Sequence, residues 1–200
     1  MKTLRHILAT AAASTLLAFP AAADAISLTE LSTYLNGLKT AKAGFTQIND
    51  DGSITTGKLV LKRPWKIRFE YDGDDTLVLA SALSVAIFDP KGNPRPETYP
   101  LKRTPLKLIL DRNINLSQDN MVVGHSYDGT ATKLIAQDPK NPELGTLELV
   151  FTDNPVQLRQ WVVNDDSGAA TTVVLGAMET GMTISNQVFD IDREVTRRSR

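Results

Sequence analysis

Few residues of this chain have side chains suited to acid–base or nucleophilic catalysis. Its 200 residues include two histidines, His6 and His125, and no cysteine. A Cys–His catalytic pair is therefore impossible, and a zinc site built from these two ligand types has too few donors. A Ser–His–Asp triad would depend on His125, yet no Gly-x-Ser-x-Gly nucleophile elbow accompanies it.

The acidic residues that stand close together lie in turn-like sequence. The stretches Asp72–Asp75 and Asp165–Gly168 each combine carboxylates with a glycine. Paired carboxylates can serve acid–base catalysis, but aspartate is also favoured in turns because its side chain accepts hydrogen bonds from nearby backbone N–H groups. The chain also lacks a phosphate-binding loop and a Gly-x-Gly-x-x-Gly pattern. We therefore expect a binding protein and not an enzyme, with no catalytic residue, no metal and no cofactor.

The N-terminus has the order of a secretory signal peptide. Two bases, at positions 2 and 5, precede an apolar stretch at 7–19, and a proline and small residues follow at 20–25. The apolar stretch is shorter and more diluted than the roughly 20 apolar residues of a membrane span. We expect residues 1–23 to be removed as a signal peptide, with cleavage after Ala25 as the alternative, and residues 24–200 to be exported as one domain.

The charge of the mature chain excludes one class of partner. The formal net charge is −1, and the signal peptide carries two bases and no acid, so its removal leaves −3. Such a charge does not suggest binding to nucleic acid or a general affinity for anionic membranes. We expect a monomer whose stability comes from burial, because there is no cysteine to form a disulfide.

Two helices are expected to cover the domain. Ser27–Glu30 has the spacing of a capping box, and leucines at 28, 31, 35 and 38 place one apolar stripe on a helix that ends near 37–39. Thr104-Pro105 has the form of a cap followed by proline in the first turn, which predicts a short helix from Pro105 to Asp111.

The rest of the chain alternates apolar and polar residues with the period of β-strands. Gly-, Pro-, Asn- and Asp-rich turns separate the segments, which is typical of an antiparallel barrel or sandwich. The expected strands are at 43–48, 57–62, 65–71, 77–81, 85–89, 121–125, 133–137, 146–152, 157–164, 171–178 and 182–185.

Several strands carry large apolar groups on one face only. In 65–71, for example, Trp65, Ile67, Phe69 and Tyr71 alternate with charged residues. A sheet with one face in water needs a cover for the other face. That apolar face is either a filled core or the wall of a ligand cavity, and the periodicity alone favours the filled core.

An ordered set of short runs resembles the outer-membrane lipoprotein carrier family, the LolA-like proteins of the periplasm. The runs are Ala43–Gln47, Gly57–Pro64, Arg68–Tyr71, Ile87–Pro90, Thr104–Leu106 and Asn186–Phe189. The resemblance covers most of the mature chain, although the chain ends in a basic tail where the family has a proline-containing ending. It implies a periplasmic protein with a half-open antiparallel β-barrel, a mainly β fold in which a few α-helices close an apolar cavity for the acyl chains of lipoproteins.

The same resemblance assigns roles to residues of this chain. It implies a lid formed by Leu106, Ile109 and Leu110. It further implies that Arg63, in the Lys-Arg-Pro run, bonds the closed lid and acts as its latch; without the family, an exposed base at a strand end is an equal alternative. The implied lipid-binding residues are Leu59, Leu61, Ile67, Phe69, Tyr71, Leu77, Leu79, Ile87, Leu147, Leu149 and Phe151.

Three functions remain open at this point. The first is a carrier of acylated lipoproteins, loaded by a lipoprotein-releasing ABC transporter of the inner membrane and unloaded at a lipoprotein receptor of the outer membrane. The second is a periplasmic lipid-binding or lipid-sensing module of the same fold that hands over no lipoprotein. The third is a hydrolase, which the single histidine of the mature chain argues against.

Overall fold

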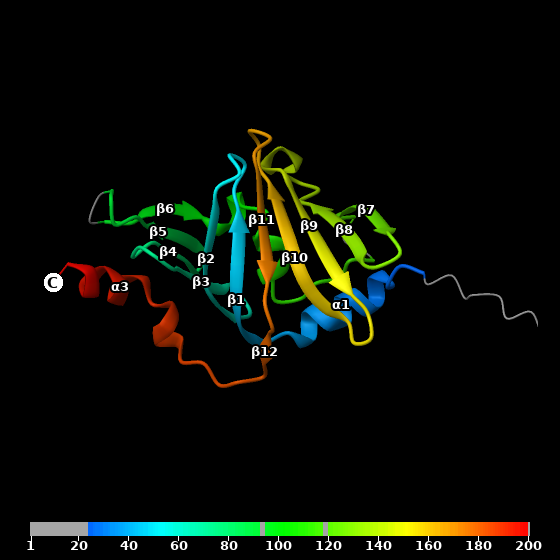
Figure 1. Ribbon diagram of the computed structural model, residues 1–200, viewed down its shortest axis with the longest axis horizontal. Coiled ribbons are helices and arrows are strands. Elements are labelled where there is room, and N and C mark those ends of the chain that lie inside the picture. Colours follow the sequence, from blue (N-terminus) through cyan, green and yellow to red (C-terminus); the bar gives the residue numbers. More distant parts are fainter. Residues whose placement is uncertain (1–23, 93–94, 118–119, 200) are drawn as a thin grey trace, which may run out of the picture.

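One curved antiparallel sheet forms most of the molecule (Figure 1). The computed structural model describes residues 24–92, 95–117 and 120–199. The expected signal peptide, 1–23, lies outside the described residues. No helix among the described residues is long and apolar enough to cross a membrane.

The sheet has twelve strands. Eleven of them follow one continuous order, β6-β5-β4-β3-β2-β1-β11-β10-β9-β8-β7, and β12 pairs with the start of β1. In the described part of the chain the two end strands, β6 and β7, are not paired with each other, so the sheet stays open. The mainly β, half-open fold expected from the sequence is therefore confirmed. The strands are β1 (Thr40–Ile48), β2 (Ile54–Lys62), β3 (Lys66–Tyr71), β4 (Leu77–Ser81), β5 (Ser84–Phe88), β6 (Glu97–Pro100), β7 (Val122–Tyr127), β8 (Thr132–Gln137), β9 (Thr146–Thr152), β10 (Gln157–Asn164), β11 (Ala170–Leu175) and β12 (Glu179–Thr180).

The β1–β2 hairpin shows how sequence sets the register. Gly52 turns the chain with a φ of 79°, which glycine adopts without steric cost. Along the ladder Phe45 stands opposite Gly57. A Cβ atom at Gly57 would lie 2.7 Å from the Phe45 ring and 2.1 Å from the carbonyl oxygen of Glu70, so only glycine fits. The ring of Phe45 lies over this glycine and meets Phe69 edge-on, with 5.5 Å between centroids.

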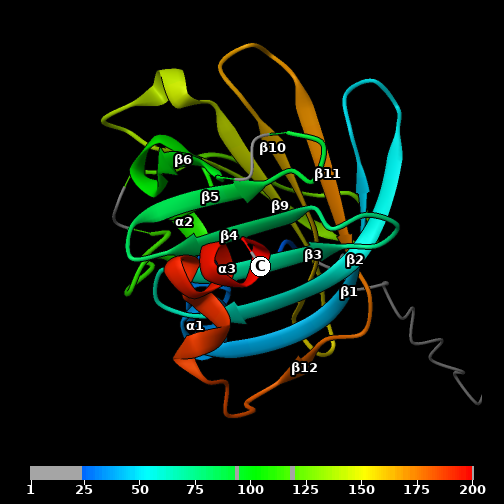
Figure 2. The same cartoon turned by 90° about the vertical axis from the view of Figure 1, so that its left-hand side faces the viewer.

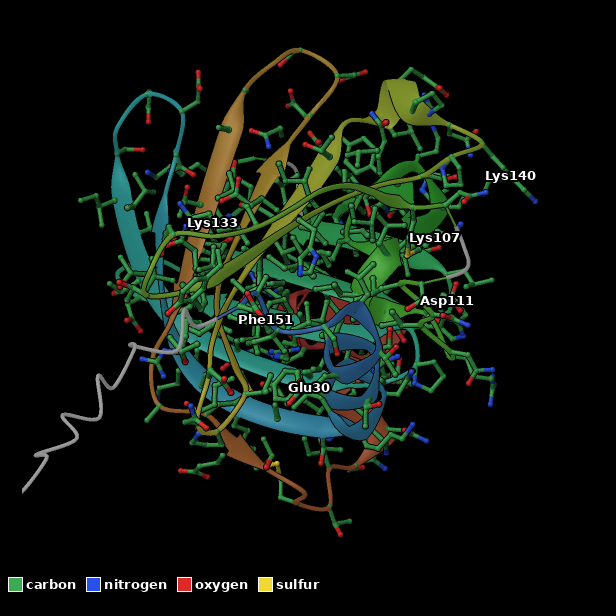
Figure 3. The ribbon with its side chains drawn as sticks, turned by 90° about the vertical axis from the view of Figure 1, so that its right-hand side faces the viewer. Glu30, Lys107, Asp111, Lys133, Lys140 and Phe151 are labelled. Carbon is green, nitrogen blue, oxygen red and sulfur yellow. The ribbon has the colours of Figure 1, made fainter. Side chains whose placement is uncertain are left out.

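Helix α1 (Leu28–Gly37) covers the inner face of the sheet. Its N-cap Ser27 accepts a hydrogen bond from the backbone N–H of Glu30 at 3.2 Å, as the capping-box spacing predicts. Leu31 and Leu35 are buried on the stripe that faces the sheet, and Leu38 follows just after the helix. The leucine stripe thus places α1 across the opening of the curved sheet (Figure 3).

The second expected helix is shorter than the sequence suggests. Helix α2 spans Lys107–Leu110, and its N-cap is Leu106. Thr104 is not its cap; it ends the 3-10 helix η1 (Leu101–Arg103) and donates its hydroxyl to the carbonyl of Leu101 at 2.9 Å. We call residues 101–116, which contain η1 and α2, the lid segment.

The C-terminal region differs most from expectation. The stretch 182–185 is not a strand, because the chain turns away from the sheet at Gly181, whose φ is 80°. Side chains hold it instead: the Lys62 ammonium donates to the carbonyl of Ile184 at 2.6 Å. It leads into the 3-10 helix η3 (Asn186–Phe189) and the unexpected helix α3 (Ile191–Arg198), capped by Asp190. Figure 2 shows α3 on the outside of the sheet, in front of β3 and β4.

The sheet therefore has apolar layers on both faces. The larger cluster lies between the inner face, α1 and the lid segment. The smaller one lies outside β4 and β5, under η3 and α3, and includes Leu77, Leu79 and Phe88. Glu194 of α3 is buried there and is bonded by Arg68 of β3 and by Arg197 and Arg198.

Candidate functional site

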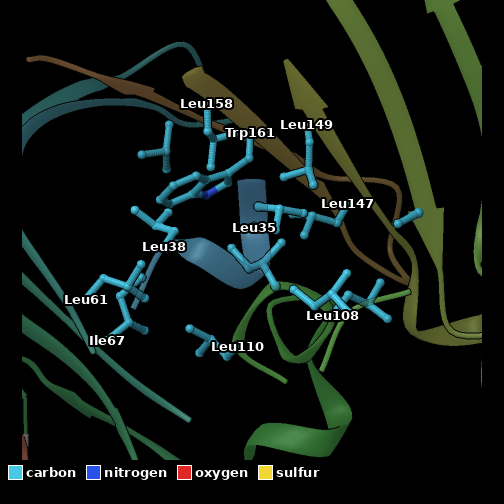
Figure 4. Close-up of a cluster of buried hydrophobic side chains, with 14 of the residues drawn as sticks. Leu35, Leu38, Leu61, Ile67, Leu108, Leu110, Leu147, Leu149, Leu158 and Trp161 are labelled. Carbon is cyan, nitrogen blue, oxygen red and sulfur yellow. The ribbon is translucent and has the colours of Figure 1, made fainter. Parts of the chain in front are cut away.

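The inner face collects most of the apolar residues expected to line one cavity. Figure 4 shows part of this cluster, with side chains from the sheet, α1 and the lid segment pointing toward one another. Tyr71 is half-buried against it, and the half-buried Ile87 shares its side of β5 with Val85, a member of the cluster. The expected residues that are at most 7 % exposed in this cluster are Leu59, Leu61, Ile67, Phe69, Leu147, Leu149 and Phe151.

Leu77 and Leu79 lie on the outer face of the sheet, and not among the lipid-binding residues of the inner face as the resemblance implies. Both are almost fully buried, but in the outer cluster with Phe88 and Phe189. Alternation along β4 indicates that its residues lie on two faces of the sheet, but it does not indicate which set faces the interior. Here Val78 and Ala80 point inward and the two leucines point outward, under the C-terminal segment.

The lid segment closes the inner cluster. Ile109 and Leu110 are buried in it, and Leu106 is partly buried against it, as expected of these three residues. The structure adds Leu101, Leu108, Ile114 and Leu116 to the same cluster. The whole lid segment thus contributes apolar groups, and not only the short helix within it.

The space left between sheet and lid is very small. A cavity of about 20 Å³ remains among twelve residues. A water molecule needs about 10–15 Å³ by this measure, so the cavity is too small for an acyl chain in this arrangement. The lining residues are Leu35, Leu38, Ala41, Leu59, Leu61, Arg63, Ile67, Ile109, Leu158, Trp161, Leu175 and Met178.

Two lining residues, Leu158 and Trp161, do not follow the simple alternation of a strand. They are three positions apart, so strict alternation would place them on opposite faces. The pairing of β10 with β9 shifts register between Leu158 and Gln160, which marks a β-bulge, and the extra residue brings both side chains inward. Trp161 then meets Phe69 edge-on at 6.1 Å between centroids.

Arg63 is the charged residue of the cavity lining, and it is only 8 % exposed. Its guanidinium donates to the carbonyl oxygen of Leu35 near the end of α1. It also donates to the carbonyl oxygen of Asp111 at 2.5 Å and reaches the side-chain oxygen of Asn36 at 3.5 Å. One side chain at the end of β2 therefore bonds both elements that cover the inner face.

The surroundings of Arg63 oppose its charge. Burial lowers the pKa of the guanidinium, and the nearby Asp111 carboxylate partly offsets this by favouring the charged form. Arginine stays protonated in proteins, so the closed arrangement carries the free-energy cost of burying a charge. The hydrogen bonds to Leu35 and Asp111 compensate for part of that cost.

Helix α1 and the lid segment are also joined directly. The amide of Asn36 donates to the carbonyl of Ile114 at 2.7 Å and accepts from its N–H at 3.0 Å. One turn earlier, the hydroxyl of Ser32 accepts from the N–H of Leu116 at 3.0 Å. Because residues 32 and 36 share one helix face, these bonds tie the lid segment along α1.

The residues considered for catalysis are engaged in structural contacts. The ring Nε2 of His125 lies 2.9 Å from the carbonyl oxygen of Ile26. Asp165 accepts hydrogen bonds from the N–H groups of Ser167 and Ala169 in its own turn, and Asp74 does the same with Thr76. Within the described ranges, no group of three histidine or acidic residues is placed to hold a metal ion.

Comparisons with known proteins agree with this geometry. The chain is 27 % identical to an outer-membrane lipoprotein carrier protein of Azotobacter vinelandii, over 95 % of this chain and 94 % of the relative. It is 25 % identical to the carrier protein of that name in Pseudomonas syringae pathovar syringae, over 94 % of each chain. Among solved structures, an outer membrane lipoprotein-sorting protein domain from Vibrio parahaemolyticus shares the fold, with a TM-score of 0.51, 9 % identity and coverage of 82 % of this chain and 95 % of that one.

A family model supplies the broader assignment. The model described as outer membrane lipoprotein carrier protein LolA matches residues 36–192, which include the sheet, the lid segment and Arg63. The chain therefore belongs to the outer membrane lipoprotein carrier protein LolA family.

Proposed function

We propose that this protein is a periplasmic carrier that shields the acyl chains of lipoproteins against the inner face of its sheet and moves them from the inner to the outer membrane. One observation carries the proposal. A large apolar face is covered by α1 and the lid segment, and one buried arginine side chain at the edge of that face bonds both covering elements. The names of the relatives support lipoproteins as the cargo.

A carrier of this kind answers an energetic need. Exposing one methylene group to water costs about 0.8 kcal/mol. A triacylated anchor has on the order of 40 such groups, so its free passage through water would cost roughly 30 kcal/mol on the same scale. An apolar face that can be opened to the anchor and closed behind it avoids this cost.

The filled interior specifies how cargo would enter. Because the cavity holds about one water molecule, acyl chains must take the place of covering residues such as Ile109 and Leu35. The sheet residues Leu59, Leu61, Ile67, Phe69, Leu149 and Phe151 would then contact the chains. Closing the lid again after unloading restores the contacts seen here, and Arg63 acts as its latch.

The proposal includes two membrane partners. An inner-membrane lipoprotein-releasing ABC transporter would load the carrier, and an outer-membrane receptor would take the lipoprotein from it. The expected signal peptide at 1–23 supports export to the compartment between these membranes.

The decisive experiment is co-purification. Cells depleted of the outer-membrane lipoprotein receptor should accumulate the tagged protein in complex with acylated lipoproteins, identified by mass spectrometry of the intact complex. Recovery of phospholipid or free fatty acid alone would favour a lipid-binding or lipid-sensing module without hand-over. Recovery of no lipid from the folded protein would contradict both.

A further inference from the structure

The closed arrangement leaves the Nε–H donor of Arg63 without a hydrogen-bond partner among the described residues. A guanidinium carries five N–H donors. Those on the two terminal nitrogens reach Leu35, Asn36 and Asp111, but Nε is buried and has no partner among the described residues. Buried donors are almost always bonded, and one left unpaired is costly.

The cavity next to Arg63 offers no replacement for that partner. The other residues of its lining present hydrocarbon, the indole of Trp161 and the thioether of Met178. Its volume of about 20 Å³ admits one water molecule, but an ordered buried water needs two to four polar partners. The site therefore fits an isolated acceptor oxygen that belongs to an otherwise apolar molecule.

Acyl chains carry such an oxygen at one end. Each ester or amide linkage has a carbonyl oxygen next to a long hydrocarbon chain. Arg63 lies at the end of β2, and Leu61 and Leu59 continue the same face of that strand inward toward Phe69. A carbonyl bonded to Arg63 would leave its chain to extend along these residues.

We propose that Arg63 Nε–H is a specificity determinant that donates a hydrogen bond to an ester carbonyl of the bound acyl chains. The inference rests on the proposed function, and it names what the site recognises: acyl chains and not alkyl chains in general. The latch and the recognition use different nitrogens of one guanidinium. Nε gains its missing partner only when cargo is bound, which favours the loaded state.

A matched pair of ligands tests this recognition. One is a tripalmitoylated cysteinyl lipopeptide, and the other is its analogue with hexadecyl ether chains in place of the two ester-linked chains. The wild-type protein should bind the ester form about tenfold more tightly, the range expected for a hydrogen bond from a charged donor. Arg63→Leu should bind both forms with equal affinity, whereas the control Arg193→Leu, at an exposed position of the outer helix α3, should keep the preference of the wild type.

Each result has a separate meaning. Equal affinity of the wild type for both ligands, or a preference that survives in Arg63→Leu, would overturn the recognition and leave the carrier function standing. Failure of the wild type to bind either ligand would overturn the carrier function as well.

A second measurement needs no variant. Infrared spectra of the wild type with a lipopeptide labelled with ¹³C at the ester carbonyls should show a bound carbonyl band at lower wavenumber than in hydrocarbon solvent. An unshifted band would overturn the recognition, whether or not Arg63→Leu folds.

Discussion

Arg63 joins three parts of the molecule through its backbone and its side chain. Its backbone N–H donates to the carbonyl of Lys39 at 2.8 Å, and its guanidinium bonds Leu35 near the end of α1 and Asp111 within the lid segment. Next to it, the N–H of Trp65 donates to the carbonyl of Leu110 at 2.9 Å. The turn between β2 and β3 thus holds the lid segment by main-chain and side-chain bonds together.

Replacing Arg63 with leucine should impair release of cargo more than uptake. Charge-assisted bonds of about 1.5–3 kcal/mol each would no longer favour closing, while an apolar side chain would suit the occupied interior. Transfer of a labelled lipopeptide from loaded protein to acceptor vesicles should slow about tenfold or more, with the exposed Arg193→Leu of α3 as the control. Transfer at the wild-type rate would refute the latch.

Phe69 tests whether the inner face is the binding surface. It is 6 % exposed and packs edge-on against Phe45 and Trp161. Phe69→Glu would place an unpaired charge there, so we expect loss of cargo capture and a loss of several kcal/mol in the free energy of unfolding. Phe69→Leu keeps the face apolar and should retain capture. Equal binding of a hydrophobic dye to folded wild type and folded Phe69→Glu would show that this face is not the site.

At the scale of elements, α1 and the lid segment behave as one covering layer. Asn36 bonds both backbone groups of Ile114, in the way that a neighbouring strand would. The lid segment contains little regular structure of its own, since α2 has four residues. Its position therefore depends on bonds to α1 and to the turn that contains Arg63.

Removing the Asn36 side chain should loosen this layer. Asn36→Ala leaves the N–H and C=O of Ile114 without partners, which should lower the free energy of unfolding by about 1–3 kcal/mol. Binding of a hydrophobic dye should rise because the inner face is uncovered more often. Thr33→Ala, on the exposed side of the same helix, is the matched control and should change neither quantity. Unchanged dye binding by Asn36→Ala would mean that the cover does not depend on this contact.

The sequence predicts which segments form helices and strands better than it predicts which face of each strand points inward. Hydrophobic period and turn chemistry predict the leucine stripe of α1, the hairpin glycine at 52 and most of the strand segments. The contact of Arg63 with a carbonyl near the end of a covering helix is seen in the structure. Its role in closing stays a proposal. The inward turn of Trp161 depends on a bulge, which leaves no clear mark in the sequence.

The sequence does contain a signal for the outer cluster. Leu77–Ala80 and Val85–Phe88 are unbroken apolar runs, which is typical of strands covered on both faces. Such runs predict a cover outside the sheet as well as inside it. That cover is the C-terminal segment, where Asp190 caps α3 and Ile191 and Val195 lie four positions apart on its apolar side. The arginines of this segment suggest an exposed basic tail, whereas the spacing of Ile191 and Val195 indicates a helix with one apolar side.

At the scale of the whole molecule, the C-terminal segment fixes one half of the sheet. Burial acts to raise the pKa of Glu194, but hydrogen bonds from Arg197 and Arg198 and the charge of Arg68 outweigh it and hold that pKa at about 2. Arg198 also lies over the ring of Phe88, at 5.1 Å from its centroid. Strands β3 to β5 are therefore held between two layers.

This carboxylate should make stability depend on acid pH. Its pKa is lower in the folded than in the unfolded protein, so its contribution is complete above pH 4.5 and is lost as the pH falls toward 2. Glu194→Gln should lower Tm at pH 7 and flatten the fall in Tm between pH 4.5 and 2, measured by calorimetry. The exposed control Glu97→Gln should leave both unchanged. A parallel fall in wild type and Glu194→Gln would contradict the role of this residue.

The unpaired ends of the sheet have a consequence for cargo size. In a closed barrel, strand number and stagger fix the diameter, and the interior therefore has a set capacity. Here the described strands β6 and β7 end the sheet without meeting, so its circumference can widen while every ladder hydrogen bond between neighbouring strands is kept. Capacity is then set by how far the two edges separate. The interior can therefore widen to hold longer acyl chains. The affinity of the protein for acylated ligands should rise gradually with acyl chain length, with no sharp upper limit.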